Sequence, residues 1–143
     1  MSSKLAREAH EARAMELANL GIESQAAGDY EAARHAWQEA LNYAEQHLPG
    51  DSVLSWIRSG LGNALLKTGD YPGALEMAGS ALEFCASVRA PLASLTMVEA
   101  YLRLGDVTCA QEYARQACDL RGERTLEVLS LEDRAALGVA TPP

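Results

Sequence analysis

Long runs with apolar residues every three or four positions alternate along the chain with short breaks rich in Gly, Asp and Pro. This spacing places the apolar side chains on one face of an α-helix, and residues of the breaks are those that end one helix and begin the next. The pattern therefore predicts an all-α chain. We expect helices at about residues 3–27, 30–47, 52–68, 71–88, 91–104 and 107–120.

One short turn sequence, Gly-Asp followed by Tyr or Val, occurs three times between these helices. Its glycine allows the left-handed conformation that ends a helix, and its Asp caps the next helix by accepting from free N–H groups. Alignment of the turns also brings alanines into register, which predicts three stacked pairs of antiparallel helices. The turns are Gly28-Asp29-Tyr30, Gly69-Asp70-Tyr71 and Gly105-Asp106-Val107, and the alanines are Ala33, Ala74 and Ala110, then Ala40, Ala81 and Ala117.

Further positions repeat around these turns. A Leu-Gly pair precedes the first two turns, and a large apolar residue follows the last aligned alanine in each repeat. The second helix of the first repeat also holds a tryptophan, where the other two repeats hold alanine. These residues are Leu20-Gly21 and Leu61-Gly62, then Tyr43, Phe84 and Leu120, and finally Trp37 with Ala78 and Ala114.

With these motifs the sequence resembles the tetratricopeptide repeat family, whose pattern pairs Leu-Gly in the first helix with alanines and an aromatic residue in the second. The break at Leu48-Pro49-Gly50-Asp51 is similar to that of long-helix members such as kinesin light chains. The resemblance implies a right-handed superhelical solenoid of three antiparallel helix pairs with a C-terminal capping helix. The expected single domain covers residues 1–143, with repeats at about 14–48, 55–88 and 91–121, a cap at 123–137 and a tail at 138–143.

The C-terminal cap is expected to cover the exposed face of the last repeat, because solenoid ends need a polar outer surface. Its apolar side chains are leucines, and a Ser followed three residues later by Asp is a signal that starts a helix. The segment is therefore either one helix or two. The leucines are Leu126, Leu129, Leu131 and Leu137, and the start signal is Ser130 with Asp133.

The formal charge of −8, with scattered basic residues, argues against nucleic acid as a partner. The three cysteines, Cys85, Cys109 and Cys118, show no paired spacing and are interpreted as small apolar residues of a reducing compartment. The N-terminus has no apolar signal core, and no apolar run approaches the ~20 residues that cross a bilayer. We expect a cytoplasmic protein with no membrane partner.

No motif for catalysis, metal binding or phosphate binding is found in the sequence. The three histidines, His10, His35 and His47, share no ligand spacing with the cysteines. We therefore expect no enzyme, no metal and no cofactor.

The resemblance implies a concave groove lined by the first helix of each pair. Some members of the family use Lys, Arg and Asn in this groove to hold a carboxylate, but only Asn63 matches such a position here. An apolar groove is instead expected to take a peptide or amphipathic helix of another protein. The expected groove residues are Met15, Asn19, Ile22, Trp56, Asn63, Leu66, Lys67, Leu95, Glu99, Leu102 and Arg103, with Ala18, Gln25, Ser59, Gly60, Leu92 and Thr96 on the same faces.

Alternatives stay open at this point. Ile22, Leu95 and Leu102 also fit a role in packing between helices, and a terminal helix of the chain itself can fill the space beside Trp56. For function, the alternatives to a general adaptor are a dedicated escort, such as a secretion chaperone or toxin-immunity protein, and a structural homodimer that uses the long first helix.

Overall fold

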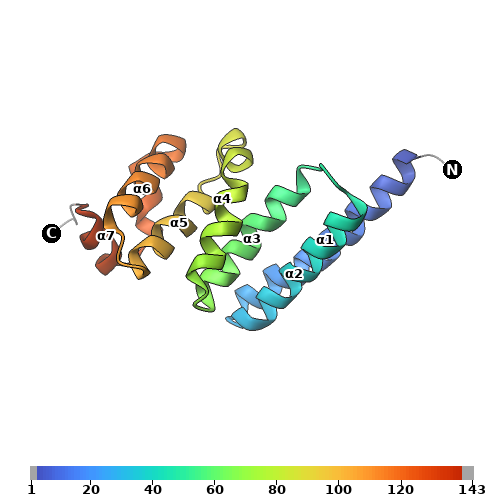
Figure 1. Cartoon of the computed structure of the whole chain (residues 1–143), viewed down its shortest axis with the longest axis horizontal. Helices are drawn as coiled ribbons and strands as arrows, with labels where there is room; N and C mark the ends of the chain where they lie inside the picture. Colours follow the sequence, from blue (N-terminus) through green and yellow to red (C-terminus); the bar gives the residue numbers. More distant parts are fainter. Residues whose placement is uncertain (1–2, 140–143) are drawn as a thin grey trace.

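The structure is a computed structural model that describes residues 3–139. Within these residues, seven α-helices and one 3₁₀ segment follow one another as sequential antiparallel pairs in a row (Figure 1). The expected all-α fold is confirmed, and each of the six expected repeat helices begins and ends within one residue of its predicted bounds. The elements are α1 (Ser3–Ala26), α2 (Tyr30–His47), α3 (Val53–Lys67), α4 (Tyr71–Ser87), α5 (Leu92–Arg103), α6 (Val107–Arg121), η1 (Glu123–Val128) and α7 (Leu131–Leu137).

All three Gly-Asp turns have the same geometry. The glycines Gly28, Gly69 and Gly105 lie in the left-handed region, with φ of 79°, 90° and 82°. Each following Asp caps its helix by accepting from the backbone N–H three residues on, at 3.1, 2.9 and 3.0 Å in chain order. Each turn therefore satisfies backbone groups that would otherwise lie free at the helix ends.

The aligned alanines form the closest packing of the stack. All six, three from each register position, have 0% exposed surface. A methyl side chain allows neighbouring helices to approach without the loss of rotamer freedom that a longer side chain would bring. Larger apolar residues fill the space between these contacts, among them Ile57, Leu61 and Val98.

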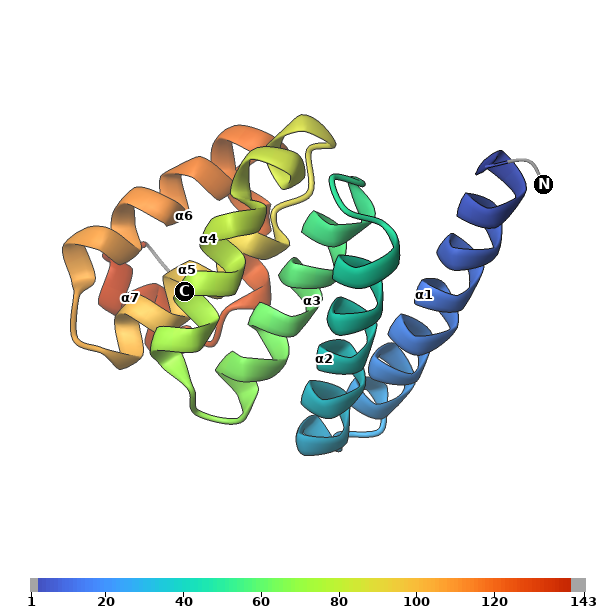
Figure 2. The ribbon, with the colours of Figure 1, turned by 45° about the vertical axis from the view of Figure 1, so that its right-hand side comes forward.

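At the outer edge of the stack, the N-terminal turns of α1 extend beyond the end of its antiparallel partner α2 (Figure 2). Arg7 Nη2 lies 2.6 Å from Asp51 Oδ2 in the loop after α2. The His10 ring stacks on that of His47 at a centroid distance of 4.4 Å, and its Nδ1 lies 2.8 Å from the Tyr43 hydroxyl. These contacts join the first turns of α1 to the end of α2 and to the loop that follows.

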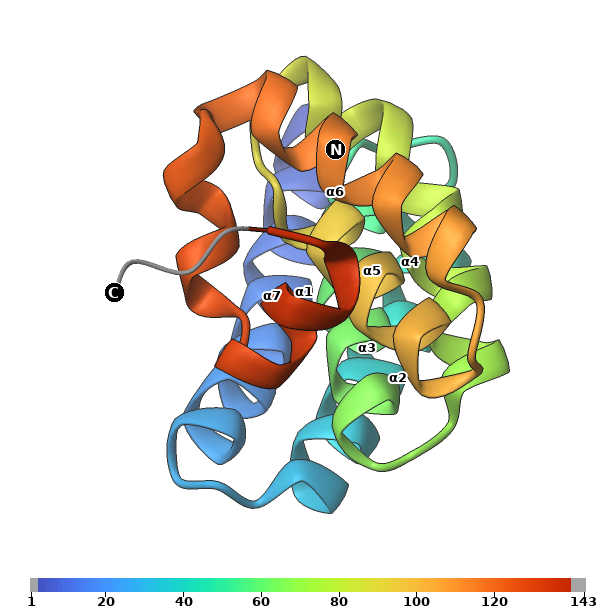
Figure 3. The same cartoon turned by 90° about the vertical axis from the view of Figure 1, so that its left-hand side faces the viewer.

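The C-terminal cap consists of two segments, η1 and α7, at the end of the stack that faces the viewer in Figure 3. Ser130 starts α7 by accepting from the N–H of Asp133 at 3.0 Å. Leu126, Leu129 and Leu137 are buried in one cluster with Val98, Ala110 and Ala114.

One expected cap residue is not part of that cluster. Leu131 is 63% exposed, because the break at Ser130 removes it from the face that one continuous helix would have presented. Gly138 follows α7 in the left-handed conformation, and residues 140–143 of the expected tail lie outside the described residues.

Candidate protein-binding site

The side chain of Trp37 projects from α2 between the two first helices α1 and α3. It is only 4% exposed, and it lies against a glycine on each side. A Cβ atom at Gly21 of α1 would lie 2.7 Å from Trp37 Nε1, and one at Gly60 of α3 would lie 2.6 Å from Cη2 and Cζ2. The indole therefore fits only because both neighbouring positions have no side chain.

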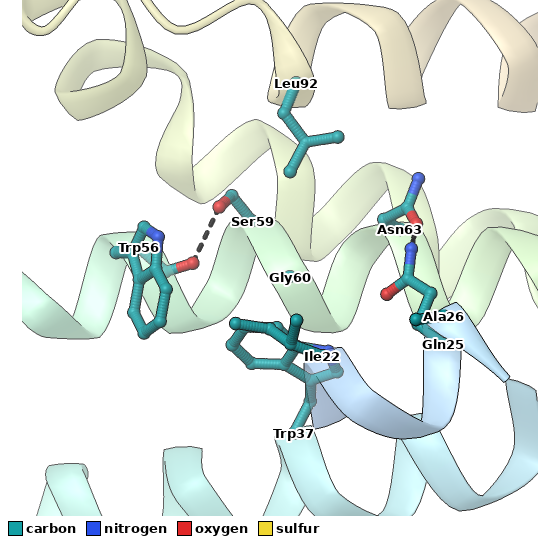
Figure 4. A pocket seen from close by; sticks show the side chains of 9 residues that line it. All are labelled: Ile22, Gln25, Ala26, Trp37, Trp56, Ser59, Gly60, Asn63 and Leu92. Carbon is teal, nitrogen blue, oxygen red and sulfur yellow. Dashed lines mark hydrogen bonds between the residues drawn. The ribbon is translucent and has the colours of Figure 1, made fainter. Parts of the chain in front are cut away.

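A hollow of about 400 Å³ opens above this indole (Figure 4). We call it the Trp37 hollow. It is mostly apolar, and none of the side chains that line it carries a charge. Its lining comes from α1, α2, α3 and the start of α5: Ile22, Gln25, Ala26, Trp37, Trp56, Ser59, Gly60, Asn63 and Leu92.

Trp56 forms one wall of the hollow. Its ring meets that of Trp37 edge to face, with a centroid distance of 5.4 Å and an interplanar angle of 71°, which is a favoured arrangement for aromatic pairs. The hydroxyl of Ser59, one turn further along α3, donates to the Trp56 carbonyl at 2.6 Å. The wall is thus part of a regular helix and packs on the hollow's floor.

The other side of Trp56 borders a second hollow of about 410 Å³, which we call the Phe84 hollow. Its rim is charged. Arg7 bonds both Glu11, at 3.1 Å, and Asp51, and the Val53 N–H and the Arg7 guanidinium hold the pKa of Asp51 below its ordinary value. The lining residues are Arg7, Glu11, Met15, Asp51, Ser52, Val53, Trp56 and Phe84.

Two amide side chains close one end of the Trp37 hollow. Gln25 Nε2, from the last turn of α1, donates to Asn63 Oδ1 on α3. Asn63 is only 8% exposed and Gln25 is half-buried. The bond links α1 to α3 at a point where both side chains also line the hollow.

Charged residues gather further along α3 and α5. Arg103 forms two bonds of 2.9 Å to the carboxylate of Asp133 in α7. Burial raises the pKa of Glu99, an effect that the nearby Lys67 ammonium opposes. The chain's own cap therefore bonds to the last turn of α5 at this end of the surface.

The structure brings together only some of the expected groove residues. Ile22, Trp56 and Asn63 line the Trp37 hollow, and Met15 lies beside Trp56 in the Phe84 hollow. Among the neighbouring positions named from the sequence, Gln25, Ser59, Gly60 and Leu92 line the Trp37 hollow too.

The other expected residues lie elsewhere. Leu66 is 7% exposed and packs with Ala74 and Ala100 in the core. Leu95 and Leu102 pack against the cluster of the C-terminal cap. The remaining four, which are Asn19, Lys67, Glu99 and Arg103, line neither hollow.

The contribution of Trp37 to the hollow was missed from the sequence. From the sequence, Trp37 is identified only as the aromatic position of the family's second helix. A signal was present in Gly21 and Gly60, since a glycine in a helix interior costs about 1 kcal/mol relative to alanine and calls for a packing reason.

The fold and hollow together define an α-helical repeat protein whose first helices line an apolar surface. A family model described as tetratricopeptide repeat matches residues 11–87, and the chain belongs to that family. The third helix pair lies beyond the match, but it is built on the same turn, with Asp106 capping α6. A search of curated proteins finds none that matches the chain.

Tetratricopeptide repeats generally mediate protein–protein interactions, and the family is typically non-catalytic. Among residues 3–139, no three His, Cys, Asp or Glu side chains are grouped so that they could hold a metal ion. No helix in the described part of the chain has the length and hydrophobicity needed to cross a membrane.

Proposed function

We propose that the chain is a non-catalytic binding module that holds a peptide or helix of another protein at the Trp37 hollow. The observation that carries the proposal is the hollow itself: an uncharged, largely apolar depression between first helices, with two tryptophans on its floor and wall. Ile22 and Leu92, on opposite helices beside it, are 44% and 40% exposed. Exposed apolar side chains around a preformed hollow are typical of sites that bind a partner.

The energetics of such a site depend on one buried anchor. Complete burial of a large apolar side chain contributes roughly 1.5–3 kcal/mol, and tryptophan is among the residues enriched at binding hot spots. Because Trp37 and Trp56 already hold each other in place, little side-chain entropy is lost when an anchor enters. A single anchor at this point is therefore expected to dominate the affinity.

The test compares two charge substitutions on the same helix. Ile22→Glu places a carboxylate at the edge of the hollow, whereas Leu20→Glu places one at a 51% exposed position that lines neither hollow. Both positions are exposed, so both variants are expected to fold. Wild type and each variant are used as bait in an extract of the native cells, and the captured proteins are identified by mass spectrometry.

A protein captured by wild type and Leu20→Glu but lost with Ile22→Glu supports the proposal, and its identity separates a general adaptor from a dedicated escort. Equal capture by all three refutes it. The mass of the free protein is measured in parallel by light scattering. A dimer that Ile22→Glu dissociates identifies a second copy of the chain as the occupant, which is the homodimer alternative.

A further inference from the structure

The amide pair at the end of the Trp37 hollow leaves two hydrogen-bonding groups free. The bond between Gln25 and Asn63 uses one donor and one acceptor, and within the described residues the Gln25 Oε1 and Asn63 Nδ2 atoms have no protein partner. Figure 4 shows both atoms turned away from the shared bond. If the oxygen and nitrogen of both amides were exchanged, one acceptor and one donor would again remain, so this conclusion does not depend on that assignment.

A free donor beside a free acceptor matches the backbone of an extended chain. An extended residue presents its own N–H and C=O on the same side, as in an antiparallel β-ladder. In a helix, by contrast, the backbone groups of every interior residue are already bonded four residues away. The amide pair can therefore bond the backbone of an extended occupant. In a helical occupant it could bond only side chains.

The Trp37 hollow beside this pair is suited to an apolar side chain rather than to a polar backbone. It has no charge in its lining, and Ile22, Trp56 and Leu92 offer it apolar surface from three helices. Its volume of about 400 Å³ suits one large aromatic or branched aliphatic group. A polar anchor would lose its hydration there with no charged partner to replace it.

The charge of the chain adds one constraint on the flanks of the segment. The net charge is −8, and the neighbouring Phe84 hollow carries Glu11 and Asp51 against the single cation Arg7. Complementary potentials favour association, and like charges oppose it. Neutral or basic flanks on a bound segment are therefore favoured over acidic ones.

From these observations we infer that the occupant is an extended segment of a partner protein with a bulky apolar side chain. That side chain enters the Trp37 hollow, while the N–H and C=O of one adjoining extended residue bond Gln25 Oε1 and Asn63 Nδ2. The inference rests on the proposed function and specifies the conformation and chemistry of the partner at the same site.

The test uses random linear peptides displayed on phage and selected on the full chain. The Gln25→Met/Asn63→Leu variant replaces both amides by apolar groups of similar shape, a double change that is nearly neutral for folding. A matched control exists on α2, where Gln38 Nε2 donates to Asn42 Oδ1 at 2.9 Å on the exposed surface. Gln38→Met/Asn42→Leu removes the same kind of pair away from the hollow. Circular dichroism of each variant verifies folding.

Selected peptides are expected to share a bulky apolar residue with neutral or basic neighbours. Their affinity, measured by titration calorimetry, is expected to fall about 5- to 150-fold in Gln25→Met/Asn63→Leu, the size of two lost hydrogen bonds, and to stay unchanged in Gln38→Met/Asn42→Leu. N-methylation of the peptide nitrogen that bonds Gln25 is expected to cause a smaller loss in wild type and none in the amide variant, because it removes one of the two bonds that this variant already lacks.

Other results distinguish failure of this inference from failure of the proposed function. Tighter binding of peptides that are cross-linked into a helix, or binding unaffected by both the amide variant and N-methylation, refutes the extended occupant, and acidic flanks refute the inferred charge of the segment. In those cases loss of binding with Ile22→Glu still supports the hollow as the site. Selected peptides that bind Ile22→Glu as well as wild type refute the proposed function itself.

Discussion

The packing of Trp37 against Gly60 makes a specific prediction about alanine substitutions in two helices. Gly60 in α3 and Gly79 in α4 are both helix-interior glycines. A Cβ at Gly79 would have only Met97 Cε nearby, at 3.9 Å, whereas one at Gly60 would lie 2.6 Å from the indole. Gly79→Ala is therefore a matched control for Gly60→Ala.

The expected effects have opposite signs. Alanine in place of glycine stabilises a helix interior by about 0.5–1 kcal/mol where there is room, so Gly79→Ala is expected to raise the free energy of unfolding by that amount. At Gly60 the contact is about 1 Å shorter than the ~3.5–4.0 Å between carbon atoms at optimal separation. Overpacking of this kind costs about 1–3 kcal/mol. After the gain in helix propensity, Gly60→Ala is expected to destabilise the chain by about 1–2 kcal/mol.

The measurement is urea unfolding followed by circular dichroism, with thermal unfolding as a second probe. At about 3 °C per kcal/mol, Gly60→Ala is expected to lower Tm by about 3–6 °C and Gly79→Ala to raise it by about 2–3 °C. In a Trp37→Leu background the penalty at Gly60 is expected to vanish, because the clashing ring is gone. Equal stabilisation by both alanines, or a penalty that persists without the indole, would refute the wedge between α1 and α3.

Three further predictions concern stability and reactivity. Asp70→Ala removes the cap of α4 and is expected to cost about 1 kcal/mol in urea unfolding, whereas the same change at exposed Asp119 is expected to cost little. The Arg103 guanidinium lowers the pKa of Asp133 in the folded chain. The stabilisation from this carboxylate is therefore complete above about pH 5 and is lost as pH falls through the folded pKa. In an acid titration, Asp133→Asn is expected to lose less of its free energy of unfolding than wild type. Cys85 is buried whereas Cys109 and Cys118 are half-buried, so iodoacetamide is expected to modify the latter two in the native chain and to reach Cys85 only after unfolding.

The helices and turns were predictable because their signals are local. The range 30–47 was obtained to the residue, because Asp29 and Pro49 stand next to its two ends and act on the backbone beside them. The buried alanines were predictable for a related reason. Repetition of a small residue at one register position indicates close packing wherever the repeat stacks on its neighbour.

The site was harder to predict because it depends on contacts between distant residues. Leu66 and Trp56 lie on the same helix and both match groove positions, but one packs in the core and the other forms a wall of the hollow. The pair between Arg103 and Asp133 depends on where the break at Ser130 directs α7, which composition does not determine. Such features depend on the placement of whole helices rather than on local sequence.

The position of the hollow within the stack follows from one exchange of large and small residues. In the first repeat the second-helix position is Trp37, and the first-helix residues that face it are Gly21 and Gly60. In the second repeat Ala78 takes the aligned position. A Cβ at Gly62 would lie 3.0 Å from the backbone nitrogen of Ala78, so helices α3 and α4 meet there directly.

The arrangement in the first repeat lowers the stability of the fold. Two helix-interior glycines each cost about 1 kcal/mol relative to alanine, and Trp37 Nε1 is buried without a hydrogen-bond partner, at a cost of about 1–3 kcal/mol. The second repeat shows that alanine at the tryptophan position packs in the same fold, so the stack itself does not require the indole. Local costs that the fold does not need are typical of functional sites. Their concentration beneath one apolar hollow supports, independently of the hollow's shape, the proposal that a partner binds over Trp37.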